Sequence, residues 1–241
     1  HRRDRMKTPS PTTLYDLDRN QFADQCAGEP KYRVDQIWQG LYDGLKLPDQ
    51  MSNVPKALRA RIAEEAPLAL TQVELQHADK GQTLKWLWKA HDGHQIETVL
   101  MLYPDRATVC VSSQAGCAMA CGFCATGQAG FDRHLTTGEI VEQVVRAAQA
   151  AGDRRVSNVV FMGMGEPLAN FDNTWNAVER LHGDLGLSAR SITVSTVGVI
   201  PGIKKLTAAS LPVTLAVSFH AGNDRLRDEL GLNARAFEMG T

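Results

Sequence analysis

The sequence predicts an α/β protein in which four successive β-α units form a parallel sheet that curves toward a barrel. Three observations lead to this prediction. From residue 107 onward, short apolar runs alternate with amphipathic helical segments, as in a parallel sheet with helical crossovers. Between residues 14 and 70, apolar residues instead recur at helical spacing. Between residues 83 and 101, two strand-like runs flank an Asp-Gly turn.

The N-terminal part is predicted to contain a leader, a helical domain and a hairpin. Residues 1–13 are polar and contain proline, so we expect a disordered leader. Residues 14–75 are expected to form a small helical domain, a candidate RNA-binding accessory, with Trp38 in its core. Ten acidic residues within the first 66 make a solvated face an equally good interpretation of its basic side chains. A β-hairpin linker is expected over residues 76–106.

Four strands and four helices are predicted over residues 107–230. The predicted strands are 107–112, 156–161, 191–195 and 213–218, and the predicted helices begin near residues 137, 173, 201 and 223. In such folds, reactive groups lie on the loops after the C-terminal ends of the strands. The three closely spaced cysteines, a Gly-Met-Gly-Glu-Pro loop, a serine and a histidine all occur at these positions.

Three cysteines lie within eight residues, in the loop after the first of these strands. Cys117, Cys121 and Cys124 have the spacing Cys-x3-Cys-x2-Cys. Clusters with four cysteines have every iron ligated and transfer electrons, whereas three thiolates leave one iron open to bind a substrate. The alternatives are a zinc site or buried thiols, but zinc sites usually pair two separated arms, and no second arm accompanies His134. The spacing therefore favours a cluster with an open iron over a zinc site, and its identification as a [4Fe–4S] cluster is what the resemblance to a known family implies.

Polar residues after the other strands are predicted to bind a ligand beside the cluster. Glycine allows a ligand to approach the backbone closely, and a glutamate carboxylate accepts hydrogen bonds from an ammonium group. Each residue alone is equally consistent with an ordinary turn or strand end. Their common position on one rim, however, favours the binding of a ligand. The residues are Gly165, Glu166, Ser195, Ser218, Phe219 and His220.

These motifs together resemble the RlmN/Cfr family of radical S-adenosylmethionine (SAM) methyltransferases, which act on adenosine in 23S ribosomal RNA. The resemblance covers about residues 14–230. It is carried by the cysteine loop with its aromatic Phe123 and by residues 96–98, 110–114, 163–167, 195–198 and 218–227. It implies a (β/α)6 radical-SAM barrel, of which about four units are present. It also implies that SAM chelates the open iron, with the Glu166 loop at its amino group and the rim residues Ser195, Ser218, Phe219 and His220 near its carboxylate and ribose.

The resemblance further implies a reaction at C2 of the adenine. One SAM methylates a relay cysteine, and a second SAM is cleaved reductively to a 5′-deoxyadenosyl radical that activates this methyl group for addition to the base. Cys110 matches the thiol that resolves the adduct by forming a disulfide with the relay cysteine, and Glu97 matches the acceptor of the C2 proton. The alternative for each is an ordinary strand residue. Cys26 is interpreted as structural.

The sequence departs from the family at its C-terminal end. All five cysteines lie at or before Cys124, so the relay cysteine is not among them. Residues 231–241 are predicted to be a non-family tail. We therefore expect this chain to be inactive in methyl transfer as given. The strand 213–218 should form an apolar sheet edge, which favours aggregation.

Composition narrows the setting without specifying the function. The 241 residues are 43% hydrophobic and 22% charged with a net charge of −1, which is ordinary for a globular protein and does not indicate a nucleic-acid partner. The odd number of cysteines suits a reducing cytoplasm, and no membrane association is expected. The resemblance implies 23S rRNA, tRNA and a reductant such as flavodoxin or ferredoxin as partners of a monomer. Methylation at C8, another radical SAM reaction and a non-catalytic cluster or RNA-binding module remain open.

Overall fold

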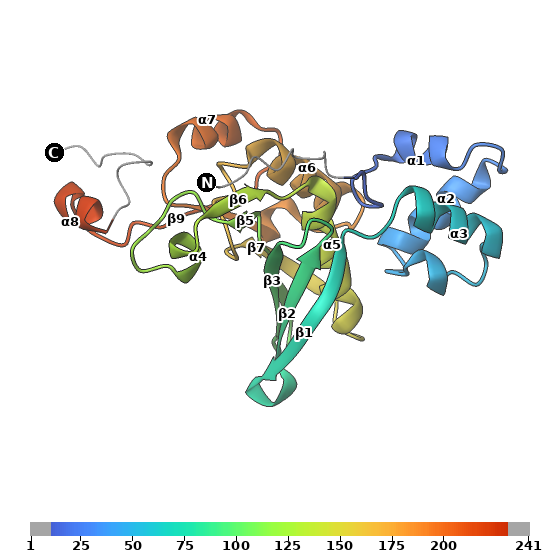
Figure 1. The fold of residues 1–241 in the computed structure, drawn as a ribbon, viewed down its shortest axis with the longest axis horizontal. Coiled ribbons are helices and arrows are strands. Elements are labelled where there is room, and N and C mark those ends of the chain that lie inside the picture. The colour runs from blue at the N-terminus through green and yellow to red at the C-terminus, as the bar shows by residue number, and fades with distance from the viewer. Residues whose placement is uncertain (1–10, 231–241) are drawn as a thin grey trace, which may run out of the picture.

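The computed structural model describes residues 11–230, which form a group of helices beside a larger sheet with its own helices (Figure 1). The helical group contains α1 (Arg19–Gln25), α2 (Tyr32–Tyr42) and α3 (Lys56–Glu65). In Figure 1 these helices lie at one end of the molecule, away from the strands. The predictions made for residues 1–10 and 231–241, including the non-family tail, lie outside the described residues.

Aromatic side chains form the core of the helical group. Trp38 packs against Tyr42 with 4.8 Å between ring centroids, and against Phe22 with 5.8 Å. The Trp38 Nε1–H also donates to Asp184 Oδ1 at 3.1 Å, which joins the helical group to the larger part of the molecule. The interpretation of Trp38 as a core residue is therefore confirmed.

Both predicted ends of the helical domain differ from the structure. Thr13, placed at the end of the predicted leader, is buried, and its hydroxyl donates to Asp16 Oδ2 at 2.7 Å. The domain was expected to extend to residue 75, but its last helix ends at Glu65 and a strand, β1 (Leu70–Ala78), follows. Most of this strand is exposed on both faces, so its sequence lacks the alternation that identifies a half-buried strand.

Within residues 11–230, seven strands form one mixed sheet in the order β1-β2-β3-β4-β7-β8-β9. The hairpin of β2 (Thr83–Ala90) and β3 (Gln95–Leu102) agrees with the prediction, but it is not a separate linker, because β3 pairs with β4 (Ala107–Cys110). From β4 onward the pairing is parallel. The remaining strands are β7 (Val156–Phe161), β8 (Ile192–Thr196) and β9 (Thr214–Val217).

Helices follow the parallel strands as the alternating pattern predicts. They are α5 (Thr137–Ala150), α6 (Phe171–Gly183), α7 (Ile200–Ala208) and α8 (Asp224–Glu229). Helix α5 packs against β1, β3 and α6. Thr136 caps its N-terminus, because its side chain accepts a hydrogen bond from the Glu139 N–H while the Glu139 side chain accepts from the Thr136 N–H. No helix among residues 11–230 combines the length and the apolar character needed to cross a membrane.

The two faces of the sheet are buried to different degrees. Alternate residues such as Val109, Val159 and Val194 are fully buried, whereas Cys110 and Ser195, on the opposite face, are only partly buried. This second face corresponds to the inner face of the predicted barrel. Strand β9 lies at one edge of the sheet, as expected for the strand 213–218.

Candidate cofactor-binding site

The cysteine loop is closed at its base by a small strand pair that the sequence did not reveal. Strand β5 (Gln114–Gly116) pairs with β6 (Phe131–His134), and the loop between them contains the short helix α4 (Ala125–Gln128). Gly116 has φ +72°, and a Cβ at this position would lie 2.1 Å from the Gly130 carbonyl oxygen. Only glycine allows the two ends of the loop to approach so closely.

All five cysteines lie in the described part of the chain and carry free thiols, so it contains no disulfide. Cys117 and Cys121 are buried, and Cys124 is partly buried. Burial raises the pKa of the Cys117 thiol, and the nearby Cys121, Glu166 and Cys124 raise it further. Burial also raises the pKa of Cys121. Thiolates grouped with a carboxylate therefore require a cationic partner, as an iron–sulfur cluster would provide.

One cavity of about 320 Å³ brings the cysteines together with most of the predicted rim residues. It lies at the C-terminal ends of the parallel strands, where the fold predicts it. Phe219 does not line it, although neighbouring His220 does, and the His220 ring lies 4.7 Å from that of Phe123. The predicted residues that line it are Cys117, Cys121, Cys124, Gly165, Glu166, Ser195, Ser218 and His220.

The Glu166 carboxylate joins two walls of this cavity. Its Oε1 accepts from the Leu168 N–H at 3.1 Å and its Oε2 from the Val197 N–H at 3.0 Å, just beyond β8. Glu166 is only 3% exposed, and burial raises its pKa, although these N–H groups and the Thr196 hydroxyl oppose the shift. The carboxylate therefore has a structural role that the sequence did not indicate, in addition to its predicted contact with an ammonium group.

Gln114, which the sequence analysis missed, supports the same loop from β5. Its Oε1 accepts from the Glu166 N–H at 2.8 Å, and its backbone N–H donates to the Met164 carbonyl at 3.2 Å. Gln114 is fully buried. The signals in the sequence are its place in the motif 110–114 and its position as a large polar residue among small ones immediately before the cysteine loop.

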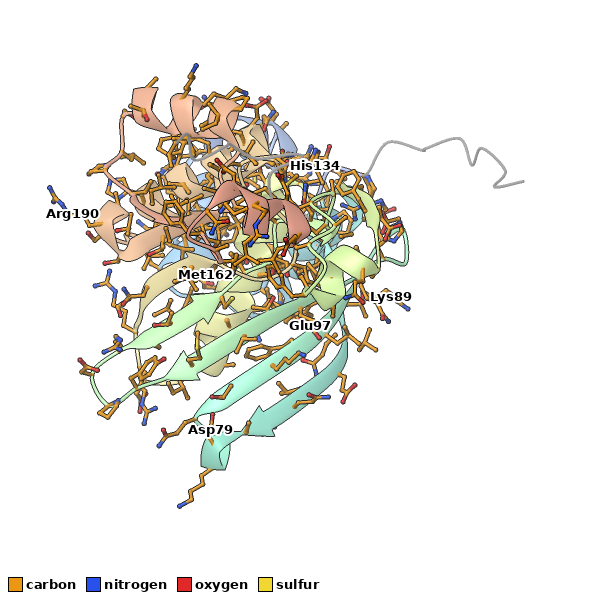
Figure 2. The ribbon with its side chains drawn as sticks, turned by 90° about the vertical axis from the view of Figure 1, so that its left-hand side faces the viewer. Asp79, Lys89, Glu97, His134, Met162 and Arg190 are labelled. Carbon is orange, nitrogen blue, oxygen red and sulfur yellow. The ribbon has the colours of Figure 1, made fainter. Side chains whose placement is uncertain are left out.

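Glu97 and Cys110 lie outside this cavity. The Glu97 carboxylate accepts from Lys85 Nζ at 2.7 Å, and its side chain is 41% exposed. Cys110 is partly buried, and burial raises its pKa, while the Met162 N–H donates to its sulfur and opposes this. Figure 2 shows Glu97 at some distance from Asp79, which marks the turn between β1 and β2.

A buried glutamine of α5 fixes the strands that carry Glu97 and Cys110. Gln143 Oε1 accepts from the Thr98 hydroxyl at 2.8 Å and from the Ser112 N–H at 2.9 Å, and its Nε2 donates to the Ser112 carbonyl at 3.0 Å. The Ser112 hydroxyl in turn donates to the Glu97 carbonyl at 2.6 Å. Gln143 therefore links β3 to the residues that follow β4, just beyond the last backbone pair of Val99 with Cys110.

The donor set fits a cubane cluster better than a single metal ion. Among residues 11–230, no three His, Cys, Asp or Glu side chains are placed so that they could hold one metal ion. The ligands of a [4Fe–4S] cluster bind different iron atoms, so their sulfurs surround a volume rather than a point. Cys117, Cys121 and Cys124 line such a volume. The same cavity is also lined by Glu166 and Ser195, whose polar side chains are of the kind that would contact SAM.

Comparisons with known proteins agree with this assignment. The model of the Radical SAM superfamily matches residues 111–239. A probable dual-specificity RNA methyltransferase RlmN from Chloroflexus aurantiacus is 51% identical over 229 residues, which is 90% of this chain and 61% of that protein. For the protein of the same name from Thermobifida fusca, the identity is 50% over 93% of this chain and 66% of that protein. This chain thus spans less than two thirds of the length of these curated relatives.

A solved structure shows the same fold. The crystal structure of a radical SAM methyltransferase from Sphaerobacter thermophilus superposes with a TM-score of 0.89 at 47% identity, over 93% of this chain and 69% of that one. Members of this superfamily use a [4Fe–4S] cluster and SAM, and the cavity offers three cysteines to the cluster and polar rim residues to SAM. The chain therefore belongs to the radical SAM superfamily, and it is similar to the proteins named RlmN over about 90% of its own length.

Proposed function

We propose that this chain forms the cluster- and SAM-binding part of a methyltransferase that acts on C2 of an adenosine in 23S rRNA and on tRNA. The observation that carries the proposal is the single cavity shared by Cys117, Cys121, Cys124, Glu166 and Ser195. The names of the relatives support an RNA substrate, and the term dual-specificity in those names supports two kinds of RNA. When bound, the cluster and SAM supply one-electron cleavage of the sulfonium and hydrogen abstraction.

The cavity residues have distinct tasks in this proposal. The three cysteines would hold the cluster and would leave one of its irons free to bind SAM. The loop 163–167 forms the wall against which the methionine part of SAM lies, with Glu166 as an acceptor for its ammonium group. The Ser195 hydroxyl donates to the Phe161 carbonyl at 2.7 Å, so it stiffens the rim between β7 and β8. His220 and Ser218 complete the rim on the side of β9.

Cys110 and Glu97 act on the adduct with the base. As the resolving thiol, Cys110 loses its proton, attacks the relay sulfur and forms a disulfide as the adduct fragments. Burial raises the pKa of the Cys110 thiol, and the Met162 N–H, which donates to its sulfur, partly offsets this rise. Glu97 accepts the C2 proton, and the ion pair with Lys85 orients its carboxylate. The partners include a low-potential reductant such as flavodoxin or ferredoxin, and the setting is the cytoplasm.

The proposal is tested by following a labelled methyl group from SAM into an rRNA fragment. Because these 241 residues contain no cysteine beyond Cys124, we expect no methylated RNA from the chain alone. A chimera in which residues 11–230 are followed by the remaining part of the Sphaerobacter methyltransferase should methylate C2 of adenosine. Its Cys110→Ala variant should give no free methylated RNA. Methylation at C8, or methylated RNA from the chain alone, would contradict the proposal.

A further inference from the structure

A line of hydrogen bonds connects the molecular surface with the loop that forms one wall of the cofactor cavity. His134 of β6 lies opposite Gln114 of β5 in the strand register, and its Nδ1 is 3.0 Å from Gln114 Nε2. Gln114 Oε1 accepts from the Glu166 N–H at 2.8 Å. The Glu166 carboxylate then accepts from the Val197 N–H at 3.0 Å. A surface imidazole is thus linked through one buried amide to the wall of the site.

The chemistry of this line fixes the orientation of the amide. A backbone N–H can only donate, so Gln114 must present its oxygen to Glu166. Its NH₂ group then faces His134, whose Nδ1 must accept, and the imidazole hydrogen is therefore on Nε2. If His134 were protonated, two donors would face each other. Rotating the Gln114 amide would only move the mismatch to the Glu166 N–H. The neutral imidazole is the form that satisfies every group.

The charged groups around His134 are engaged with other partners. On its own strand, Arg133 forms a bidentate pair with Glu139 of α5 and also bonds Asp92 of the β2–β3 turn. Asp132 pairs with His94 at 3.3 Å. The Phe131 ring packs against the imidazole with 5.3 Å between centroids, and partial burial lowers the pKa of His134. These surroundings favour the neutral ring near pH 7.

We propose that His134 is a positioning residue that makes SAM binding depend on pH. In its neutral form it accepts from Gln114, keeps the Gln114 oxygen on the Glu166 N–H and so holds the loop 163–167 in the shape that lines the cavity. A proton on Nδ1 removes this acceptor, the loop loses a support and SAM binds more weakly. The proposal rests on the proposed function in taking SAM as the ligand, whereas the support of the loop is independent of it.

The direction of the pH effect follows from proton linkage. Because the pKa of His134 is lowered in the folded chain, the folded state binds fewer protons at this site than the unfolded state does. The stabilisation is therefore present above the ordinary histidine pKa of about 6.5 and is lost as the pH falls through the lower folded value. The shape of the loop 163–167 that binds SAM also requires neutral His134. The affinity of the chain for SAM should therefore fall on acidification.

The first test measures SAM affinity of the anaerobically reconstituted 241-residue chain between pH 8 and pH 5.5. In the wild type, the Kd should rise about fivefold or more over this range. His134→Asn places an amide oxygen near the position of Nδ1 without a titratable group, so it should bind SAM as the wild type does at pH 8 and lose most of the pH dependence. His134→Leu offers no acceptor, so its affinity should be low throughout. An equal pH dependence in the wild type and His134→Asn would overturn the proposal.

The second test follows the loop without SAM. NMR of the imidazole nitrogens should show the Nε2–H tautomer at neutral pH, and the Glu166 amide should lose protection from hydrogen exchange on acidification relative to His134→Asn. The intrinsic exchange rate changes equally in both proteins, so their ratio isolates the effect of the histidine. An Nδ1–H tautomer, or equal protection at every pH, would refute the proposal. Failure of SAM to bind at any pH, with a normal result here, would instead count against the proposed function.

Discussion

Replacing Cys117, Cys121 or Cys124 with alanine is expected to abolish binding of the iron–sulfur cluster. Reconstituted with iron and sulfide under anaerobic conditions, the wild-type chain should bind about four irons, and each variant close to none. The reason is geometric, because the three thiols line one cavity and no other cysteine does. A cubane with only two protein ligands would be lost during purification.

Cys26→Ala is the matched control for these variants. Cys26 is also buried and free, but it lies in the helical domain, where burial raises the pKa of its thiol. Its replacement should leave the iron content unchanged. Iron and sulfide analysis together with the visible absorption of the cluster measures both outcomes. Stoichiometric zinc, or full iron content in a variant of the cysteine loop, would refute the cluster assignment.

Gly165→Ala is expected to weaken SAM binding by about two orders of magnitude. Gly165 has φ +103°, and a Cβ would lie 2.6 Å from Gln114 Cβ and 2.7 Å from its backbone nitrogen. Strain of this kind is worth about 1–3 kcal/mol before the clash is added, and each 1.4 kcal/mol is about tenfold in affinity. The loop would have to move away from Gln114, and this movement would displace the neighbouring Glu166 and the cavity wall that it forms.

Gly183→Ala, at the end of α6, is the control for this glycine. Nothing lies within 4 Å of the position that its Cβ would occupy, so SAM affinity should remain unchanged and thermal stability should be equal to or slightly above that of the wild type, because alanine favours the helix. Calorimetric titration of SAM into both reconstituted variants, each with normal iron content, measures the difference. Wild-type affinity in Gly165→Ala would show that the loop 163–167 does not form the wall of the SAM site.

The parallel core was predictable because its sequence pattern arises from local burial. Strand β7 was predicted with the bounds that the structure gives it, since a short apolar run containing Val159 and Phe161 is followed by a glycine-rich loop. Strands β5 and β6 were missed because they are only three and four residues long. Strand β1 was missed because its pairing with β2, rather than burial of its own side chains, makes it a strand.

The site was predictable where chemistry concentrates in one short segment. The cysteine spacing and the Glu166 loop predicted a group of residues at the strand ends, and most of these residues line one cavity. The supporting roles of Gln114 and Gln143 were not predictable, because their partners lie up to 52 residues away in sequence. The sequence also did not show that Glu97 lies outside the cysteine cavity, because its position depends on how the strands pair in the folded sheet.

The assignment of the cavity as a radical SAM site is tested most directly by whether this chain cleaves SAM reductively. The reconstituted chain is mixed with SAM and a low-potential reductant, and the products are separated by chromatography. We expect 5′-deoxyadenosine and methionine from the wild type and from Cys26→Ala, and neither from Cys121→Ala. Intact SAM in the presence of a reduced four-iron cluster, with tight SAM binding established, would contradict the claim that the cavity of Cys117, Cys121, Cys124 and Glu166 is a radical SAM site.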